Sequence, residues 1–394
     1  MPTTLTFFPV GNGDMTLIKF GDGVATTLMI DVNIRQDADD PNGDAHDVAR
    51  DLRERLKRDD KGRPYVDAFL LSHPDEDHCR GITRHFHLGP LDEYPDDDED
   101  DQDKRIVIRE IWSSPIVFRR KKKDSPNLCP DAEAFAKEAR RRVSVNRKQA
   151  FIVGEGDRIL ILGEDVEGKT DDLGSILIKV DERFSRINGK ESSYFSGLLL
   201  APLEVKDEES EEDSLAKNRS STIINFTLAA DASTPDGANF VTGGDAEVFI
   251  WNRLWEHYES EAEALSYDLL QAPHHCSWHS LSHDSWSDDG EDAEVDEGAR
   301  NALSQARDGA IIVASCNPIE DDDNDPPCIR AKREYQDILK DGSGDFYCTG
   351  DDPNSTLVFT VTADGIQPPS KKESGSKAAA VISSARTPMP HGAS

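Results

Sequence analysis

Histidine and carboxylate side chains are concentrated in one short segment that follows an apolar run. The segment HPDEDH places His73, Asp75, Asp77 and His78 within six residues, directly after residues 66–71, which are apolar except for Asp67. A turn at the end of a buried strand can direct these side chains into one pocket. Imidazole nitrogen combined with carboxylate oxygen suits Zn²⁺ or Mn²⁺ better than Ca²⁺, which prefers oxygen ligands alone. The pattern predicts a divalent metal site, and the alternative is an acidic, solvated loop.

A second segment, FVTGGDAE over residues 240–247, ends an apolar run in two glycines and Asp245. Glycines let the backbone approach a ligand closely, and a carboxylate at the end of a strand can bridge two metal ions. The alternative role for Asp245 is to cap the helix that follows.

A third segment, DLLQAPHHCSWHS over residues 268–280, carries His274 and His275 beside Cys276. The apolar start predicts a strand, and the histidines would lie in the loop after it. Without a cysteine partner, Cys276 is expected to be a packed thiol rather than a ligand. His279, Ser277 or Ser280 could assist a leaving group.

Apolar periodicity predicts the elements that must position these side chains. Helical spacing indicates helices over residues 47–58 and 246–259. The order of strands, helix, strands, insertions, strands, helix and strands is typical of two packed sheets with helices outside. The predicted strands cover residues 3–9, 15–20, 26–31, 66–71, 106–111, 159–162, 176–180, 198–200, 222–228, 239–241, 310–314 and 356–361.

The net charge of the chain limits the kinds of molecule that it can bind. The 394 residues include 45 Lys and Arg against 78 Asp and Glu, a formal charge of −33, which disfavours coating of nucleic acid by bulk electrostatics. Residues 119–148 reverse this balance, with 11 basic and 4 acidic side chains. This basic segment is interpreted as a phosphate-binding patch; the alternative is a solvated helix and loop. The predicted nucleic-acid contacts are Arg119, Arg120, Lys121, Arg140, Arg141 and Arg142.

Location is predicted from what the sequence lacks. No apolar run approaches the roughly 18–20 residues of a membrane span. The first residues carry no basic segment typical of a signal peptide, and the six cysteines form no CxxC pair. A cytoplasmic protein without a membrane partner is therefore expected, and a protein partner is left open.

The three segments in this order resemble the metallo-β-lactamase superfamily and, within it, the hydrolase domain of ComEC-type competence proteins. VGNGD over 10–14 is similar to the opening VGxGD turn of that branch, and Asp31 follows a strand as in the family. SHPDEDHCRG over 72–81 matches SHxDxDHxxG. NRSS over 218–221 and TGGD over 242–245 resemble N-x-x-S and TGD, with one extra glycine. Residues 268–277 resemble aDxLxxPHHGS, with Cys276 in place of glycine.

The resemblance implies an α+β fold, the four-layer αββα metallo-β-lactamase sandwich with acidic loop insertions. One hydrolase domain would cover residues 1–367, followed by a disordered tail over 368–394. The insertions would lie near 92–104, 119–150, 203–217 and 283–298.

The resemblance also implies a ligand set for one or two Zn or Mn ions. His73 and Asp75 would lean to one metal and Asp77 and His78 to the other, with Asp245 bridging them and Asp31 orienting the loop. Asp77 and Asp245 are expected to be the catalytic residues. Either His274 or His275 would close the second position, and His275 is favoured because the family's ligand usually precedes a small residue. One histidine of the superfamily has no counterpart near Trp112–Pro115, and His85 and His87 are alternatives with a structural role expected for both.

The implied activity is hydrolysis by a metal-activated water, which needs no side-chain nucleophile. The chain contains no GxSxG, GxxxxGK[ST] or HExxH motif. The first expectation is a phosphodiesterase or nuclease that cleaves DNA. The alternatives are a hydrolase of a small phosphodiester such as a nucleotide or cyclic nucleotide, and a catalytically silent module that binds a partner.

Overall fold

The computed structural model describes residues 2–38, 45–100, 103–204, 209–217 and 219–369. Asn218 of the NRSS motif and the predicted tail from residue 370 onward lie outside these residues, as do parts of the acidic segments 92–104 and 203–217.

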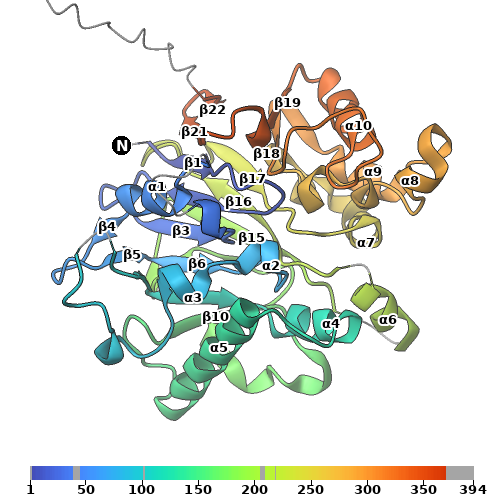
Figure 1. The fold of residues 1–394 in the computed structure, drawn as a ribbon. Coiled ribbons are helices and arrows are strands. Elements are labelled where there is room, and N and C mark those ends of the chain that lie inside the picture. Colours follow the sequence, from blue (N-terminus) through green and yellow to red (C-terminus); the bar gives the residue numbers. More distant parts are fainter. Residues whose placement is uncertain (1, 39–44, 101–102, 205–208, 218, 370–394) are drawn as a thin grey trace, which may run out of the picture.

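Two large sheets form the centre of the fold (Figure 1). The nine-stranded sheet has the order β11-β10-β9-β6-β3-β2-β1-β21-β22 and the seven-stranded sheet the order β12-β15-β16-β17-β18-β19-β20. The strands of the first are β1 (Thr4–Phe7), β2 (Thr16–Lys19), β3 (Thr27–Ile30), β6 (Ala68–Leu70), β9 (Glu110–Ser113), β10 (Arg158–Leu162), β11 (Leu177–Ile178), β21 (Leu357–Thr362) and β22 (Gly365–Gln367). Those of the second are β12 (Arg183–Phe184), β15 (Phe195–Ala201), β16 (Ile223–Leu228), β17 (Ala238–Val241), β18 (Tyr267–Gln271), β19 (Ala306–Ala314) and β20 (Asp345–Cys348).

Two small sheets and the helices complete the described structure. A four-stranded sheet contains β4 (Lys57–Arg58), β5 (Pro64–Val66), β7 (Phe86–His87) and β8 (Ile106–Ile108), and a hairpin pairs β13 (Arg186–Ile187) with β14 (Lys190–Glu191). The helices are α1 (Val48–Arg55), α2 (Glu76–Cys79), α3 (Ile82–His85), α4 (Pro115–Asp124), α5 (Pro130–Lys148), α6 (Glu209–Lys217), α7 (Val248–Tyr258), α8 (Trp286–Asp289), α9 (Glu297–Leu303) and α10 (Ile329–Lys340). Short 3₁₀ turns cover Gln36–Ala38, Leu91–Glu93, Val166–Gly168, Asp171–Ile176, Glu259–Leu265, Pro273–Cys276, Trp278–Ser280, Gly290–Asp292 and Thr349–Asp351.

Apolar side chains on both faces of each large sheet explain how the elements pack. One buried cluster joins the two sheets; in it, the rings of Trp112 (β9) and Phe226 (β16) stack at 6.4 Å. A second cluster joins the nine-stranded sheet to α1 and α5, and a third joins the seven-stranded sheet to α7, α9 and α10. Figure 1 shows these two sets of helices on opposite sides of the sheets. The fold is a mixed structure of several sheets and helices, in agreement with the expected α+β class.

The pairing of the strands brings the three chemical segments to one edge of the sheets. β3 and β6 are parallel, as are β17 and β18, so the loops that follow each pair start side by side. Because β2 runs antiparallel to β3, with Thr16 opposite Ile30, the residues just before β2 also lie at this edge. Carboxyl ends of parallel strands are common positions for ligand sites.

Most predicted strands are confirmed, and the segment 119–150, expected to be an insertion, contains most of α4 and the whole of α5. Here α4 and α5 contribute Phe118, Phe135 and Ala139 to the core beneath the nine-stranded sheet. Since Phe135, Ala139 and Val143 recur every four residues, they form an apolar face, and the basic side chains lie around it. None of the helices within the described ranges is both long and apolar enough to cross a membrane.

Candidate metal centre

Asp245 lies at the centre of the site, in the loop between β17 and α7. A Cβ at Gly243 would lie 2.6 Å from the carbonyl oxygen of Gln271, so only glycine allows this loop to pack against the end of β18. The backbone N–H of Asp245 donates to Oγ of Ser221 at 3.0 Å, which fixes the carboxylate in place. The Asp245 side chain is buried, and its two oxygens face different sets of residues.

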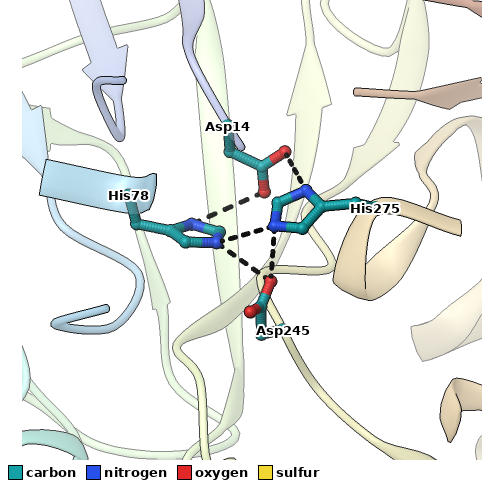
Figure 2. A group of neighbouring side chains, drawn as sticks. All are labelled: Asp14, His78, Asp245 and His275. Carbon is teal, nitrogen blue, oxygen red and sulfur yellow. Dashed lines mark hydrogen bonds and ion pairs between the residues drawn. The ribbon is translucent and has the colours of Figure 1, made fainter. Parts of the chain in front are cut away.

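Oδ1 of Asp245 belongs to a four-residue group with Asp14, His78 and His275 (Figure 2). Nε2 of His78 is 2.9 Å and Nε2 of His275 is 3.3 Å from this oxygen, and the two nitrogens are 3.3 Å apart. Asp14 faces the same two rings, at 3.7 Å from Nδ1 of each. All four residues are buried, and each offers one ligand atom within 4.8 Å of the others.

Hydrogen bonds made by Nδ1 of each ring determine that Nε2 faces Asp245. Nδ1 of His78 donates to Oδ2 of Asp31 at 2.8 Å, and Nδ1 of His275 donates to the carbonyl oxygen of Ser315 at 3.1 Å. A carbonyl or carboxylate can only accept, so the Nε2 lone pairs of both histidines remain available for a metal ion.

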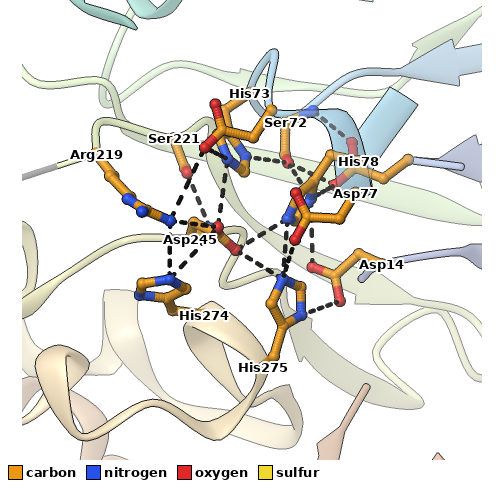
Figure 3. Close-up of polar contacts among 12 residues, drawn as sticks. Asp14, Ser72, His73, Asp77, His78, Arg219, Ser221, Asp245, His274 and His275 are labelled. Atoms are coloured by element: carbon orange, nitrogen blue, oxygen red, sulfur yellow. Dashed lines mark hydrogen bonds and ion pairs between the residues drawn. The ribbon is translucent and has the colours of Figure 1, made fainter. Parts of the chain in front are cut away.

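Oδ2 of Asp245 belongs to a three-residue group with His73 and Asp75 (Figure 3). Nε2 of His73 is 3.4 Å from this oxygen and 3.6 Å from Oδ2 of Asp75. The two groups therefore share one carboxylate, as expected for a bridging residue.

His274 and Asp77 lie beside these groups without belonging to either. Nε2 of His274 accepts a hydrogen bond from Nη1 of Arg219 at 3.0 Å, so its lone pair is engaged. Oδ2 of Asp77 is 3.2 Å from Nε2 of His275, at the rim of the site. Of the two adjacent histidines, His275 has the geometry of a ligand.

Burial and mutual charge shift the pKa values of these groups in opposite directions. Burial raises the pKa of Asp14 to about 6 and lowers that of His274 to about 4. Burial and His78 oppose protonation of His73, but Asp245 and Asp75 raise its pKa to about 9. Burial disfavours ionised Asp245, but the surrounding histidines hold its pKa well below the usual range.

Several buried polar atoms at the site lack a hydrogen bond. Oδ1 of Asp14, Nε2 of His73 and both carboxylate oxygens of Asp245 have no hydrogen-bonding partner among the described residues. Unsatisfied buried donors and acceptors are rare in proteins, and lone pairs that converge on one region are the arrangement a cation requires. The cluster of Asp and His residues fits a divalent metal ion.

The loop that carries the histidines has an unusual backbone. His274, His275 and Cys276 have φ of 49°, 53° and 65°, three consecutive side-chain-bearing residues in the left-handed region. Such conformations are costly outside glycine and cluster at functional sites. They place His275 in the buried group while His274 turns toward Arg219.

Two of the six predicted nucleic-acid contacts lie inside the protein. Arg120 and Arg142 are buried: Arg120 bonds to Glu212, and Arg142 to Glu138 and to the carbonyl oxygen of Ile108. This corrects the prediction that both residues contact nucleic acid, because neither reaches the surface.

Of the other four predicted nucleic-acid contacts, three form ion pairs with carboxylates and one is exposed. Arg119 pairs with Asp165 and Glu212, Arg141 with Glu138 and Asp157, and Nζ of Lys121 lies 2.8 Å from Oδ1 of Asp75. Arg140 is exposed. Most of these cations neutralise carboxylates that are distant in sequence, which a count of charges along the chain cannot show.

Two residues of the site were missed by sequence reasoning, Asp14 and Arg219. Asp14 is the last residue of the VGNGD turn, and that motif could have identified it. Arg219 carries no comparable signal. Of the alternatives for the missing histidine, Nε2 of His87 is 2.9 Å from the carbonyl oxygen of Pro90 and His85 contacts Arg53, so both belong to the surrounding structure.

A pocket of about 470 Å³ opens beside the site. Burial raises the pKa of one of its carboxylates, Glu247, to about 7. Its lining residues are Asn12, Asp77, Arg219, Glu247, His274, His275, His279, Asp325 and Pro326.

Comparisons with known proteins found one distant structural similarity. No known protein family matches the chain, and no curated protein does. Among solved structures, the crystal structure of unliganded yeast PDE1 is similar at a TM-score of 0.39 and 11% sequence identity, over 88% of this chain and 97% of that chain. A likeness this distant leaves the function to be argued from the site itself.

Proposed function

We propose that this chain is a metal-dependent hydrolase of phosphodiester bonds, with a metallo-β-lactamase type of sandwich related to the hydrolase domain of ComEC-type proteins. One observation carries the proposal: the Asp245 carboxylate is shared by two buried groups of ligand-type atoms. The sequence motifs that supply these atoms support the family, and the pocket beside them gives a substrate access.

A divalent cation bound here would supply Lewis-acid activation of water and of a phosphoryl oxygen. Hydrogen bonds with neighbouring residues orient the side chains that would bind this cation. Asp31 and the Ser315 carbonyl hold His78 and His275 with Nε2 inward, and Ser221 holds the loop of Asp245. His73 and Asp75 lie near Oδ2 of Asp245, whereas the four-residue group lies near Oδ1. Each group of ligand-type residues therefore has one oxygen of this carboxylate.

The substrate class has two candidates. The resemblance to ComEC-type proteins favours DNA. The small phosphodiester is favoured by the structure of the basic segment, because Arg120 and Arg142 are buried and Arg119, Lys121 and Arg141 are ion-paired. With a net charge of −33, a polyanion meets more repulsion than a nucleotide-sized ligand.

A direct assay separates these candidates. The purified protein is incubated with bis(p-nitrophenyl) phosphate, a cyclic nucleotide, single-stranded DNA and plasmid, each with Mn²⁺, Zn²⁺ or EDTA. We expect hydrolysis that depends on the metal and is lost in Asp245→Asn. The control is Asp364→Asn, which changes an exposed carboxylate in the β21–β22 turn and should retain the activity. Cleavage of the small diesters alone selects the second candidate, and cleavage of DNA selects the first. No hydrolysis with any metal would overturn the proposal in favour of a silent binding module.

A further inference from the structure

The two groups of ligand atoms around Asp245 differ in the cations that already accompany them. Oδ1 of Asp245 and the carboxylate of Asp14 face His78 and His275. In the part of the chain that the structure describes, no lysine or arginine forms an ion pair with either of these carboxylate positions. On this side, therefore, the carboxylate oxygens of the four-residue group face imidazoles rather than a lysine or arginine.

The three-residue group has two protein cations against its carboxylates. Nη1 of Arg219 is 3.6 Å from Oδ2 of Asp245 and 3.9 Å from Oδ2 of Asp75. Nζ of Lys121 is 2.8 Å from Oδ1 of Asp75. Figure 3 shows the guanidinium of Arg219 directed at Asp245 and His274.

Arg219 also engages His274, the histidine that lies beside this group. Nε2 of His274 is 3.8 Å from Oδ2 of Asp245, and it accepts the hydrogen bond of Arg219. A guanidinium stays protonated at any physiological pH and cannot be a ligand. Its charge would repel a divalent ion beside it.

We propose that the site holds one divalent cation, in the group of Asp14, His78, Asp245 and His275, and that the Arg219 guanidinium occupies the second cation position. This inference rests on the proposed function and specifies it. Arg219 lines the pocket and keeps 38% of its side chain exposed, so its forked donors can also reach an anionic phosphoryl oxygen. The site then combines one metal ion with a fixed organic cation, and Lys121 neutralises Asp75 behind them.

The stoichiometry of metal binding tests this without using activity. Metal-free protein is dialysed against Mn²⁺ or Zn²⁺, and bound metal per chain is measured by elemental analysis and titration calorimetry. We expect one ion in the natural chain and one in Arg219→Lys, which keeps a cation. We expect a second ion in Arg219→Gln, because the carboxylates and His274 are then free to bind it. Arg140→Gln, an exposed arginine on α5, is the matched control and should stay at one.

Two further variants locate the ion. His275→Gln should lose it, whereas His73→Gln should keep it, since His73 belongs only to the three-residue group. Circular dichroism of every variant shows whether it is folded. Two ions in the natural chain, or loss of the ion in folded His73→Gln, would overturn the inference.

The inference and the proposed function fail separately. One ion per chain without hydrolysis of any diester would remove the function and leave the assignment of Arg219 intact. Hydrolysis by a chain that binds two ions would support the function and overturn the assignment of Arg219. If Arg219 holds the phosphoryl group, Arg219→Gln should also raise KM by roughly tenfold to a hundredfold, the loss expected for a charge-assisted hydrogen bond.

Discussion

Asp31 and His78 form a buried hydrogen bond of 2.8 Å between the carboxylate oxygen Oδ2 and Nδ1 of the ring, and this bond directs Nε2 of His78 at Asp245. The same carboxylate accepts hydrogen bonds from the backbone N–H and hydroxyl of Ser72. Asp31 thus joins the end of β3 to the loop after β6 and sets the tautomer of a ligand in that loop. It is a positioning residue rather than a ligand.

Replacing Asp31 by Asn should weaken metal binding while preserving the fold. Asn has nearly the same shape and tolerates the left-handed backbone that Asp31 adopts, with φ of 55°. It removes the charge that holds His78, and loss of such a partner typically costs about 10–100-fold in metal affinity. Competition with a chromophoric chelator measures the affinity. Unchanged affinity in Asp31→Asn would show that the hydrogen bond does not orient the ligand.

Removing the metal should destabilise the chain. In the metal-free state, among the described residues, the buried carboxylate of Asp14 faces only histidines, and that of Asp245 faces histidines and Arg219. A ligand at a hundred times its Kd adds about 2.7 kcal/mol to the free energy of unfolding. Melting curves with saturating Mn²⁺ and with EDTA should therefore separate, and those of Asp245→Asn should coincide. Equal curves for the natural chain would argue against a site in this cluster.

The ligand-type residues could be predicted from the local pattern of each segment. How the segments lie relative to one another could not. The loops after β6, β17 and β18 carry ligand-type residues at strand ends, which an apolar run followed by His or Asp reveals. Asp14 reaches the same place because β2 pairs antiparallel with β3. The VGNGD motif marks Asp14 as a candidate, but its place beside the histidines is set by sheet pairing.

The role of the basic segment could not be predicted from its composition. Whether Arg120 or Lys121 faces solvent depends on which carboxylates the fold brings opposite, and their partners Glu212 and Asp75 lie 92 and 46 positions away in the chain. A helix in this segment was considered only as the alternative to a phosphate-binding patch, because charged residues dominate its sequence. Pro130 at its first turn and the apolar face that includes Phe135 are the local signals of that helix.

Cys276 offers a test of the strained histidine loop. At its φ of 65°, alanine would keep the left-handed conformation, whereas glycine would relieve it. Both changes remove the same buried sulfur, so Cys276→Gly should be more stable than Cys276→Ala by about 1–2 kcal/mol. Cys316 is an equally buried thiol without a positive φ, and there alanine should be the more stable replacement. Urea unfolding of the four variants measures both differences, and a higher stability of alanine at position 276 would show that the loop is unstrained.

Glu138 should make the stability of the chain sensitive to acid. This buried carboxylate accepts hydrogen bonds of 2.7 Å from both Arg141 and Arg142. Burial alone would raise its pKa, but the two arginines lower it below the usual value. A carboxyl whose folded pKa lies below its unfolded pKa of about 4.3 stabilises the fold above that pH. The contribution is lost as the pH falls through the lower, folded value.

Glu138→Gln should therefore destabilise the chain by about 3–5 kcal/mol at pH 7, because it leaves the buried Arg142 without its counter-charge. The difference from the natural chain should shrink below pH 4, where protonation weakens the natural pair as well. Glu133→Gln, an exposed change on the same helix, is the control and should have little effect at either pH. Urea unfolding at both pH values measures the differences. Unchanged stability of Glu138→Gln at pH 7 would mean that the arginines of this segment do not depend on the carboxylate, and would reopen their assignment to an external anion.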